Sequence, residues 1–191
     1  MKMISSFFND GNGDPEPRLL AAGGTHVFES QAPCKLVRAE PVGTVNDLGW
    51  AVTLALEAGS EGEAEVACGG ERIMLKVLAP ARLEIKLAGE GEPTGIPIDE
   101  PFQVRALLYD EQGRELEVGK FTTFEWAQTE ILEPANDRSA GEFGLCDTCF
   151  GMHNFRAVKP GTGSIMARLG DLEGKLLIEA KPSGPKTDNS S

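Results

Sequence analysis

The residues of this chain that are best suited to chemistry form one short motif, Cys146-Asp-Thr-Cys149-Phe-Gly-Met-His153. Two cysteines with two residues between them can close a local disulfide, or can bind a metal ion through their thiolates with an imidazole as a further ligand. Covalent attachment of haem requires a histidine directly after the second cysteine. Phe150 occupies that position, so the motif does not predict haem attachment.

Of the remaining interpretations of this motif, a disulfide is favoured. A structural zinc site needs four ligands, and only Cys146, Cys149 and His153 stand near one another in the sequence. A thioredoxin-like redox pair lies at the N-terminus of a helix in an α/β unit, whereas the flanking residues alternate as strands do. We therefore predict a disulfide between Cys146 and Cys149 and no cofactor. A zinc site and free thiols are the alternatives.

Other kinds of catalytic site find little support in the sequence. His26 and His153 are the only histidines, and no serine or cysteine has a base and an orienting acid in a recognisable motif. Gly89-Glu-Gly91 lacks the lysine and the helix of a phosphate-binding loop. With 30 acidic residues in the chain, carboxylate pairs occur by chance and do not indicate a glycosidase. The sequence predicts that the protein is not an enzyme.

The charge of the chain narrows the classes of partner. The formal net charge is −12 over 191 residues, which disfavours nucleic acid and anionic lipid because both bind to basic surfaces. No apolar run reaches the ~18–20 residues of a transmembrane helix. We expect no nucleic-acid partner and no membrane insertion.

Alternation of apolar and polar residues dominates the chain and predicts strands with one face on a core. It runs through residues 52–56, 64–68, 83–87 and 102–108. A helical period holds nowhere for more than two turns, and only residues 126–133 allow a short helical turn. The sequence therefore predicts an all-β fold.

Two segments far apart in the chain follow the same plan, Gly62-Glu-Ala-Glu-Val-Ala-Cys68 and Gly161-Thr-Gly-Ser-Ile-Met-Ala167. In each, a glycine opens the segment, small or branched residues occupy every second position, and a turn with glycine ends it. A second alternating run follows, over residues 73–77 and 176–180. Each pair is typical of the last hairpin of a small β domain, so the sequence predicts a repeated domain.

A boundary between two domains is predicted at Ala79-Pro80-Ala81, where one alternating run has ended and the next begins. We expect a small β domain at residues 18–79 and a larger sandwich at residues 81–182, joined stiffly because few residues separate them. Residues 1–17 are expected to form a flexible tether and residues 183–191 a disordered tail, because both are rich in breakers and polar residues.

Residues 81–182 resemble the bacterial immunoglobulin-like domains of the Big superfamily, also called invasin/intimin-like. The resemblance rests on Leu83-x-Ile85-x-Leu87, on Phe102 to Tyr109 followed by Asp110-Glu-Gln-Gly113, and on Phe121-Thr-Thr-Phe-Glu-Trp126. Its most specific part is Lys159-Pro-Gly-Thr-Gly-Ser-Ile-Met-Ala167, which is similar to the family's Ala-x-x-Pro-Gly-Thr-Ala-x-Ile-x-Ala. Residues 18–79 match only near their start and end, so they are predicted to be a reduced copy.

The resemblance implies two tandem immunoglobulin-like β-sandwich domains in a secreted or cell-surface protein with a structural or adhesive role and no catalytic residues. The partner would be a protein or carbohydrate at a cell surface, or neighbouring copies of the same chain. We expect an extracellular, cell-surface or periplasmic location. The apolar stretch within residues 1–10 is too short for a signal peptide, so the targeting segment is expected to be absent from this chain.

A disulfide between Cys34 and Cys68 is predicted to cross-link the small domain. Cys68 matches Ala167 of the second copy, where a small inward-facing residue is expected. We expect the bridge to join the two sheets, as in many immunoglobulin domains, and to place the protein in an oxidising compartment. Two unpaired core cysteines are the alternative, and four cysteines allow three connectivities.

The loop at residues 136–155 supports a second interpretation, because long loops on rigid sandwiches often carry recognition. Phe143, Phe150, His153 and Phe155 are its candidate binding residues. Three functions therefore stay open. They are a structural or adhesive module, a carbohydrate- or protein-binding module that uses this loop, and a zinc-binding or redox-sensitive module at the cysteine motif.

Three further residues carry expectations about exposure. Trp50 and Trp126 are expected in the core rather than as platforms for sugar rings. His26 alternates with its neighbours on an expected strand and is expected at the surface or on a sheet edge.

Overall fold

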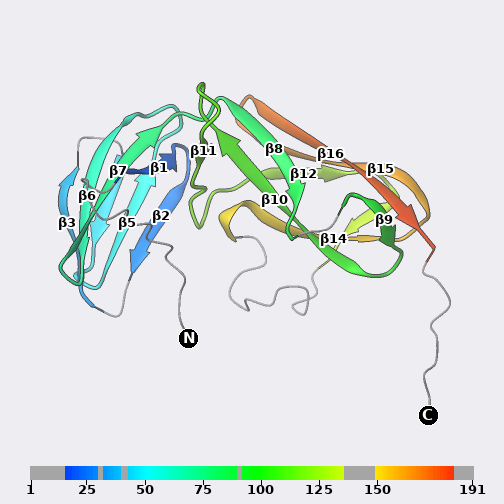
Figure 1. The fold of residues 1–191 in the computed structure, drawn as a ribbon, viewed down its shortest axis with the longest axis horizontal. Helices are drawn as coiled ribbons and strands as arrows, with labels where there is room; N and C mark the ends of the chain where they lie inside the picture. Colours follow the sequence, from blue (N-terminus) through cyan, green and yellow to red (C-terminus); the bar gives the residue numbers. More distant parts are fainter. Residues whose placement is uncertain (1–15, 30–31, 40–42, 90–91, 136–148, 183–191) are drawn as a thin grey trace, which may run out of the picture.

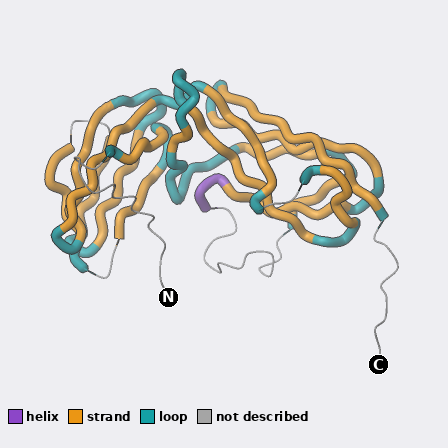
Figure 2. Tube along the Cα trace, viewed as in Figure 1, coloured by secondary structure: helices purple, strands orange, loops and turns teal. Residues whose placement is uncertain are grey.

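The fold consists of strands, as the alternation of the sequence predicts. The computed structural model describes residues 16–29, 32–39, 43–89, 92–135 and 149–182. Within them the chain forms sixteen strands and one 3-10 helix of three residues, and Figure 2 shows how far strands dominate. The predictions on residues 1–15 and 183–191, on Phe143 and on Cys146 lie outside the described residues.

The first seven strands form an N-terminal sandwich of two facing sheets (Figure 1). One sheet has the order β1-β7-β6-β3 and the other β2-β5-β4. All these pairings are antiparallel except β1 with β7, which is parallel. The strands are β1 (Arg18–Ala21), β2 (Thr25–Glu29), β3 (Cys34–Ala39), β4 (Gly43–Asp47), β5 (Ala51–Leu56), β6 (Gly62–Cys68) and β7 (Glu71–Leu78).

The core of this sandwich lies between the two sheets and follows from the alternation. On β5, Val52 and Leu54 are fully buried and face Val66 of β6 and Val77 of β7 within one cluster. Burial of each such side chain contributes about 1.5–3 kcal/mol. The period-two pattern thus sets which face of each strand turns inward.

The remaining strands form a larger C-terminal sandwich. One sheet has the path β11-β10-β14-β13, with β8 also paired to β10, and the other has the order β12-β15-β16-β9. Its core holds Phe155, Leu108 and Ile178, all fully buried. The elements are β8 (Arg82–Leu87), β9 (Thr94–Pro97), β10 (Pro101–Tyr109), β11 (Glu115–Leu116), β12 (Glu125–Gln128), β13 (Leu132–Pro134), η1 (Cys149–Gly151), β14 (Met152–Ala157), β15 (Gly161–Leu169) and β16 (Leu172–Lys181).

The two sandwiches repeat one topology. The last strand of each, β7 or β16, pairs in parallel with an early strand, β1 or β9, and in antiparallel fashion with β6 or β15. The facing sheets follow β2-β5-β4 and β10-β14-β13. This is the arrangement of immunoglobulin-like sandwiches. The repeated segments of the sequence are the hairpins β6–β7 and β15–β16, and the first copy is the reduced one because its described part has no counterpart of β8 or β11.

Two predictions about local structure are wrong. Residues 126–133 contain parts of two strands rather than a helical turn, because Trp126 pairs with Ala167 of β15 and Leu132 with Ala157 of β14. Trp126 is half-buried against the core, as predicted. Trp50, in contrast, is 59% exposed, because it lies in the turn between β4 and β5, where neither sheet covers it.

Candidate functional site

Strand β1 joins the two sandwiches. One of its edges pairs with β7, from Arg18↔Leu75 to Ala21↔Leu78. On its other edge the amide of Ala21 donates to the carbonyl of Glu117 at 2.9 Å, and the amide of Glu117 donates to the carbonyl of Leu19 at 2.8 Å. A hydrogen-bonded path of strands therefore runs from one sandwich through β1 to β11 in the other (Figure 1).

Backbone packs directly against backbone beside this strand. A Cβ atom on Gly119 would lie 2.7 Å from the carbonyl oxygen of Thr25 and 2.9 Å from its nitrogen, closer than non-bonded atoms approach. The amide of Phe121 donates to the same Thr25 carbonyl at 3.4 Å. Gly119 is therefore required by the close approach of the segment after β11 to strand β2.

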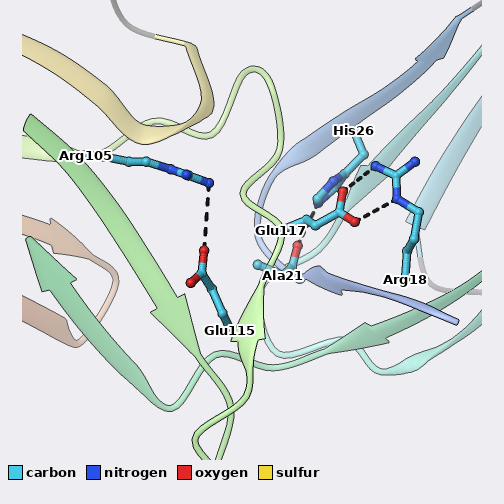
Figure 3. Close-up of polar contacts among 6 residues, drawn as sticks. All are labelled: Arg18, Ala21, His26, Arg105, Glu115 and Glu117. Atoms are coloured by element: carbon cyan, nitrogen blue, oxygen red, sulfur yellow. Dashed lines mark hydrogen bonds and ion pairs between the residues drawn. The ribbon is translucent and has the colours of Figure 1, made fainter. Parts of the chain in front are cut away.

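An ion pair spans the same junction (Figure 3). The Nε of Arg18 donates to Oε1 of Glu117 at 2.7 Å, and the Nη2 of Arg18 donates to the other carboxylate oxygen. The hydrogen bond that Arg18 donates to the Glu117 carboxylate raises the pKa of Arg18. Both side chains are about two-fifths exposed (39% and 41%), so the pair contributes about 0.2–1 kcal/mol and mainly fixes orientation.

His26 lies beside this ion pair (Figure 3), and its side chain is only 5% exposed. Its Nε2 donates to the carbonyl of Ala21 at 3.0 Å. Burial lowers the pKa of His26, while the Ala21 hydrogen bond and the charge of Glu117 oppose this effect and Arg18 adds to it. The prediction for His26 is right about the edge, since β2 ends its sheet. It is wrong about the surface, because the side chain occupies an inward position of β2, opposite the buried Leu54.

A cleft of about 330 Å³ opens beside this junction. The N-terminal sandwich contributes Arg18, His26 and Phe28 to its wall. The segment after β11 adds Glu117, Val118 and Lys120, and β10, η1 and β14 of the C-terminal sandwich add Arg105, Phe150 and Met152. The cleft therefore combines basic groups with apolar surface.

Phe150 reaches this cleft through an unusual backbone conformation. Its φ is 57° and that of Gly151 is 73°, so two consecutive residues adopt the left-handed region. For a residue other than glycine, this conformation raises the free energy of the folded state. The amide of Phe150 donates to the carbonyl of Lys120 at 3.3 Å, and the Phe150 side chain stays 45% exposed.

Of the four candidate binding residues, only Phe150 is both described and exposed. Phe155 is fully buried, because it occupies an inward position of β14, and this corrects its assignment to a binding surface. His153 is half-buried, its ring stacks on Phe155 at 4.7 Å, and its Nδ1 donates to the carbonyl of Asn154 at 3.1 Å. In the described part of this segment, Phe155 therefore belongs to the core and Phe150 lines the cleft.

Cys34 and Cys68 form a disulfide, with 4.1 Å between their Cα atoms. The two residues are direct partners on β3 and β6, neighbouring strands of one sheet. The pairing is the predicted one, but the bridge does not join the two sheets. The physical reason is that Cys34 lies on the third strand, on the same sheet as β6, and not on β2, which belongs to the opposite sheet.

The cysteine motif is only partly visible. Cys146 and the side chain of Cys149 lie outside the described residues, so their predicted disulfide and the zinc alternative stay predictions. Within the described residues no group of three or more His, Cys, Asp or Glu side chains is placed to hold a metal ion. The same part of the chain contains no helix that is long and apolar enough to cross a membrane.

Sequence reasoning missed the basic residues of the junction. Arg18, Arg105 and Lys120 belong to no motif, and Arg18 and Glu117 are 99 residues apart. Gly119 gives only a weak signal, because it begins the turn that the Thr122 amide closes on its carbonyl, although its own φ is not in the left-handed region and does not require glycine. A glycine of that kind often marks a close approach of two backbones.

The burial of His26 predicts that acid destabilises the protein. The folded-state pKa lies below the ordinary value of 6.5, so folding favours the neutral imidazole and the unfolded chain binds the proton more readily. The resulting stability is complete above about pH 6.5 and declines as the pH falls from there to the folded-state pKa. Unfolding by urea at a series of pH values measures this decline.

A His26→Gln variant keeps an amide donor for the Ala21 carbonyl but has no titrating group. We expect it to lose the part of the pH dependence just below pH 6.5. An unchanged slope in the His26 variant would show that another group is responsible.

Comparisons with known proteins find distant structural likenesses only. No family model and no curated protein matches the chain. Among solved structures, domains 4–9 of the surface layer protein SbsC align with a TM-score of 0.37 and 14% identity over 89% of this chain and 30% of that one.

Two further solved structures align with most of this chain. The Escherichia coli adhesin FdeC aligns with a TM-score of 0.36 and 16% identity over 86% of this chain and 61% of that one. Invasin, a bacterial integrin-binding protein, aligns with a TM-score of 0.36 and 11% identity over 85% of this chain and 34% of that one. The chain thus spans less than two thirds of each, and at such identities their roles do not carry over to its residues.

Proposed function

We propose that this chain is a non-catalytic structural or adhesive module of an extracellular or cell-surface protein. In this proposal residues 18–79 and 81–182 are two domains that act as one stiff unit. The observation that carries it is strand β1, which is hydrogen-bonded to β7 of its own sandwich and to the segment after β11 of the other. A module that transmits force or holds a binding surface at a distance needs such a fixed joint.

The connection between the sandwiches supports the same function. Only Ala79, Pro80 and Ala81 separate β7 from β8, and the proline fixes one backbone angle. The amide of Ala81 donates to the carbonyl of Tyr109 at 2.8 Å, so the linker itself is held. The within-sheet disulfide of Cys34 and Cys68 suits an oxidising, extracytoplasmic compartment.

Nuclear magnetic resonance relaxation of backbone amides tests the stiffness. We expect both sandwiches to report the same overall correlation time and the same axis of tumbling, because they move as one body. Two different correlation times, each suited to a domain of its own size, would contradict the proposal. The measurement uses the full chain.

A second candidate function is recognition through the loop at residues 136–155. The observation that favours it is Phe150, which is held in the left-handed region with 45% of its side chain exposed. Strained residues of this kind occur often where ligands bind. Zinc or redox chemistry at Cys146, Cys149 and His153 remains a third proposal, without a described geometry.

A further inference from the structure

We propose that the cleft between the two sandwiches binds a carboxylate that carries an apolar group. The ligand is either a small organic acid or an acidic side chain beside an apolar residue of a protein partner. The proposal goes beyond the scaffold function and does not depend on it. It names a site and a ligand chemistry for the junction.

The charge of the cleft is the first argument. Its wall holds three basic residues, Arg18, Arg105 and Lys120, and one acidic residue, Glu117. With His26 neutral, the wall carries a formal charge of +2, although Glu115 and Glu29 beside it form ion pairs with Arg105 and Lys120. Basic residues gathered in one cleft of a chain with a net charge of −12 favour the binding of an anion there.

The availability of the donors is the second argument. Arg18 is occupied, because its guanidinium already donates twice to Glu117. Arg105 and Lys120 are different. The Nη2 of Arg105 forms an ion pair with Glu115 at 3.9 Å and the Nζ of Lys120 forms one with Glu29 at 3.9 Å, and both distances are too long for a hydrogen bond. Both groups can therefore donate to a ligand.

The orientation of Arg105 agrees with this role. In Figure 3 its side chain extends from strand β10 toward the space beside His26 and Glu117, with Glu115 below its tip. A planar guanidinium in that position suits two-point binding of a carboxylate. Lys120 reaches the same cleft from the segment after β11 and supplies a second positive charge.

The apolar part of the wall is the third argument. Phe28, Phe150 and Met152 line the cleft beside the basic groups, and Phe150 is held there at a cost in backbone energy. The volume of about 330 Å³ fits the low end of small-ligand sites. An inorganic anion would leave this apolar surface in water, so an organic carboxylate fits better.

A titration followed by ¹H–¹⁵N spectra of the full chain tests the site, with 3-phenylpropionate as the probe. We expect shifts at the cleft residues and a Kd on the order of 1 mM, since a fragment of this size gains little free energy per atom. The uncharged 3-phenylpropionamide is expected to bind at least about tenfold more weakly, because it lacks the charge-assisted hydrogen bonds.

The variants Arg105→Gln and Lys120→Gln are expected to weaken 3-phenylpropionate about tenfold each. The matched control is Arg168→Gln, which removes the same charge from an exposed pair with Glu173 on β15 and β16 and is expected to leave the Kd unchanged. A blocked tetrapeptide, acetyl-Gly-Phe-Glu-Gly-amide, forms the second arm. Tighter binding of the peptide identifies a protein partner, and tighter binding of the free acid identifies a small ligand.

Three results would overturn the proposal. The first is the absence of shifts with both probes at 20 mM, on the order of twenty times the expected Kd. The second is equal binding of the acid and its amide. The third is that the Arg168→Gln control weakens binding as much as the cleft variants do. Spectra of each variant without ligand show whether the fold is retained. None of these outcomes bears on the stiffness of the joint, which is measured separately.

Discussion

Replacement of both Cys34 and Cys68 with alanine is expected to destabilise the N-terminal sandwich by about 3.5–4 kcal/mol, according to the chain-entropy relation for a closed loop. The bridge spans 34 residues and thus restricts much of the unfolded form of this sandwich. Small domains bury too little apolar surface to tolerate such a loss easily. Unfolding by urea, followed by amide hydrogen exchange at buried residues of β5 and β7, measures the change.

The effect should be confined to one sandwich. We expect exchange at Phe155 and Ile178, in the core of the C-terminal sandwich, to change much less. Alkylation of the denatured wild-type protein without reductant is the control, because it counts free thiols and also reports on Cys146 and Cys149. A loss below about 1 kcal/mol would mean that the unfolded chain is already restricted, contrary to the chain-entropy account.

The Gly119→Ala variant is expected to open the joint while both cores stay folded. The added methyl carbon would lie 2.7 Å from the carbonyl oxygen of Thr25. A side chain could relieve such a clash by changing its rotamer, but a backbone carbonyl cannot. Overpacking of this kind costs about 1–3 kcal/mol, and relief by separation sacrifices junction hydrogen bonds worth about 1 kcal/mol each. Residual dipolar couplings should show two alignment frames in place of one.

His26 supplies a second measure of the same opening. His26 lines the cleft at the junction, so opening should expose it to more water and the pKa of His26 should rise toward its ordinary value, because burial is the main cause of the shift. A Gly59→Ala variant serves as the control for backbone strain without a clash, since φ 75° at Gly59 disfavours alanine but its Cβ would meet nothing within 4 Å. One common alignment frame in the Gly119 variant would contradict the expectation.

Local sequence patterns predicted the strands and the repeat well. The segments that begin at Gly62 and Gly161 are β6 and β15, and the runs after them are β7 and β16. Such patterns succeed because burial of every second side chain is a local property of a strand on a core. The pairing of Cys34 with Cys68 also followed from position, since both occupy inward sites of the small sandwich.

The errors arose where the answer depended on what lies opposite a residue. Alternation gave Trp50 and His26 no distinguishing mark, yet a turn leaves Trp50 exposed and His26 lies on the inward face of β2, opposite Leu54. The sheet that each cysteine joins depends on how strands are ordered, and strand order is not encoded in the period of any single strand.

The sequence by itself determined that this chain is all-β, that it repeats one sandwich topology and that one cysteine pair cross-links the smaller copy. Only the tertiary structure decided that β1 is shared, that His26 is buried and that Arg18, Arg105, Lys120 and Phe150 meet at one cleft. The physical reason is distance along the chain. A strand pattern reports the contacts of near neighbours, whereas the joint is made by residues 99 positions apart, whose meeting is set by how two whole sandwiches pack.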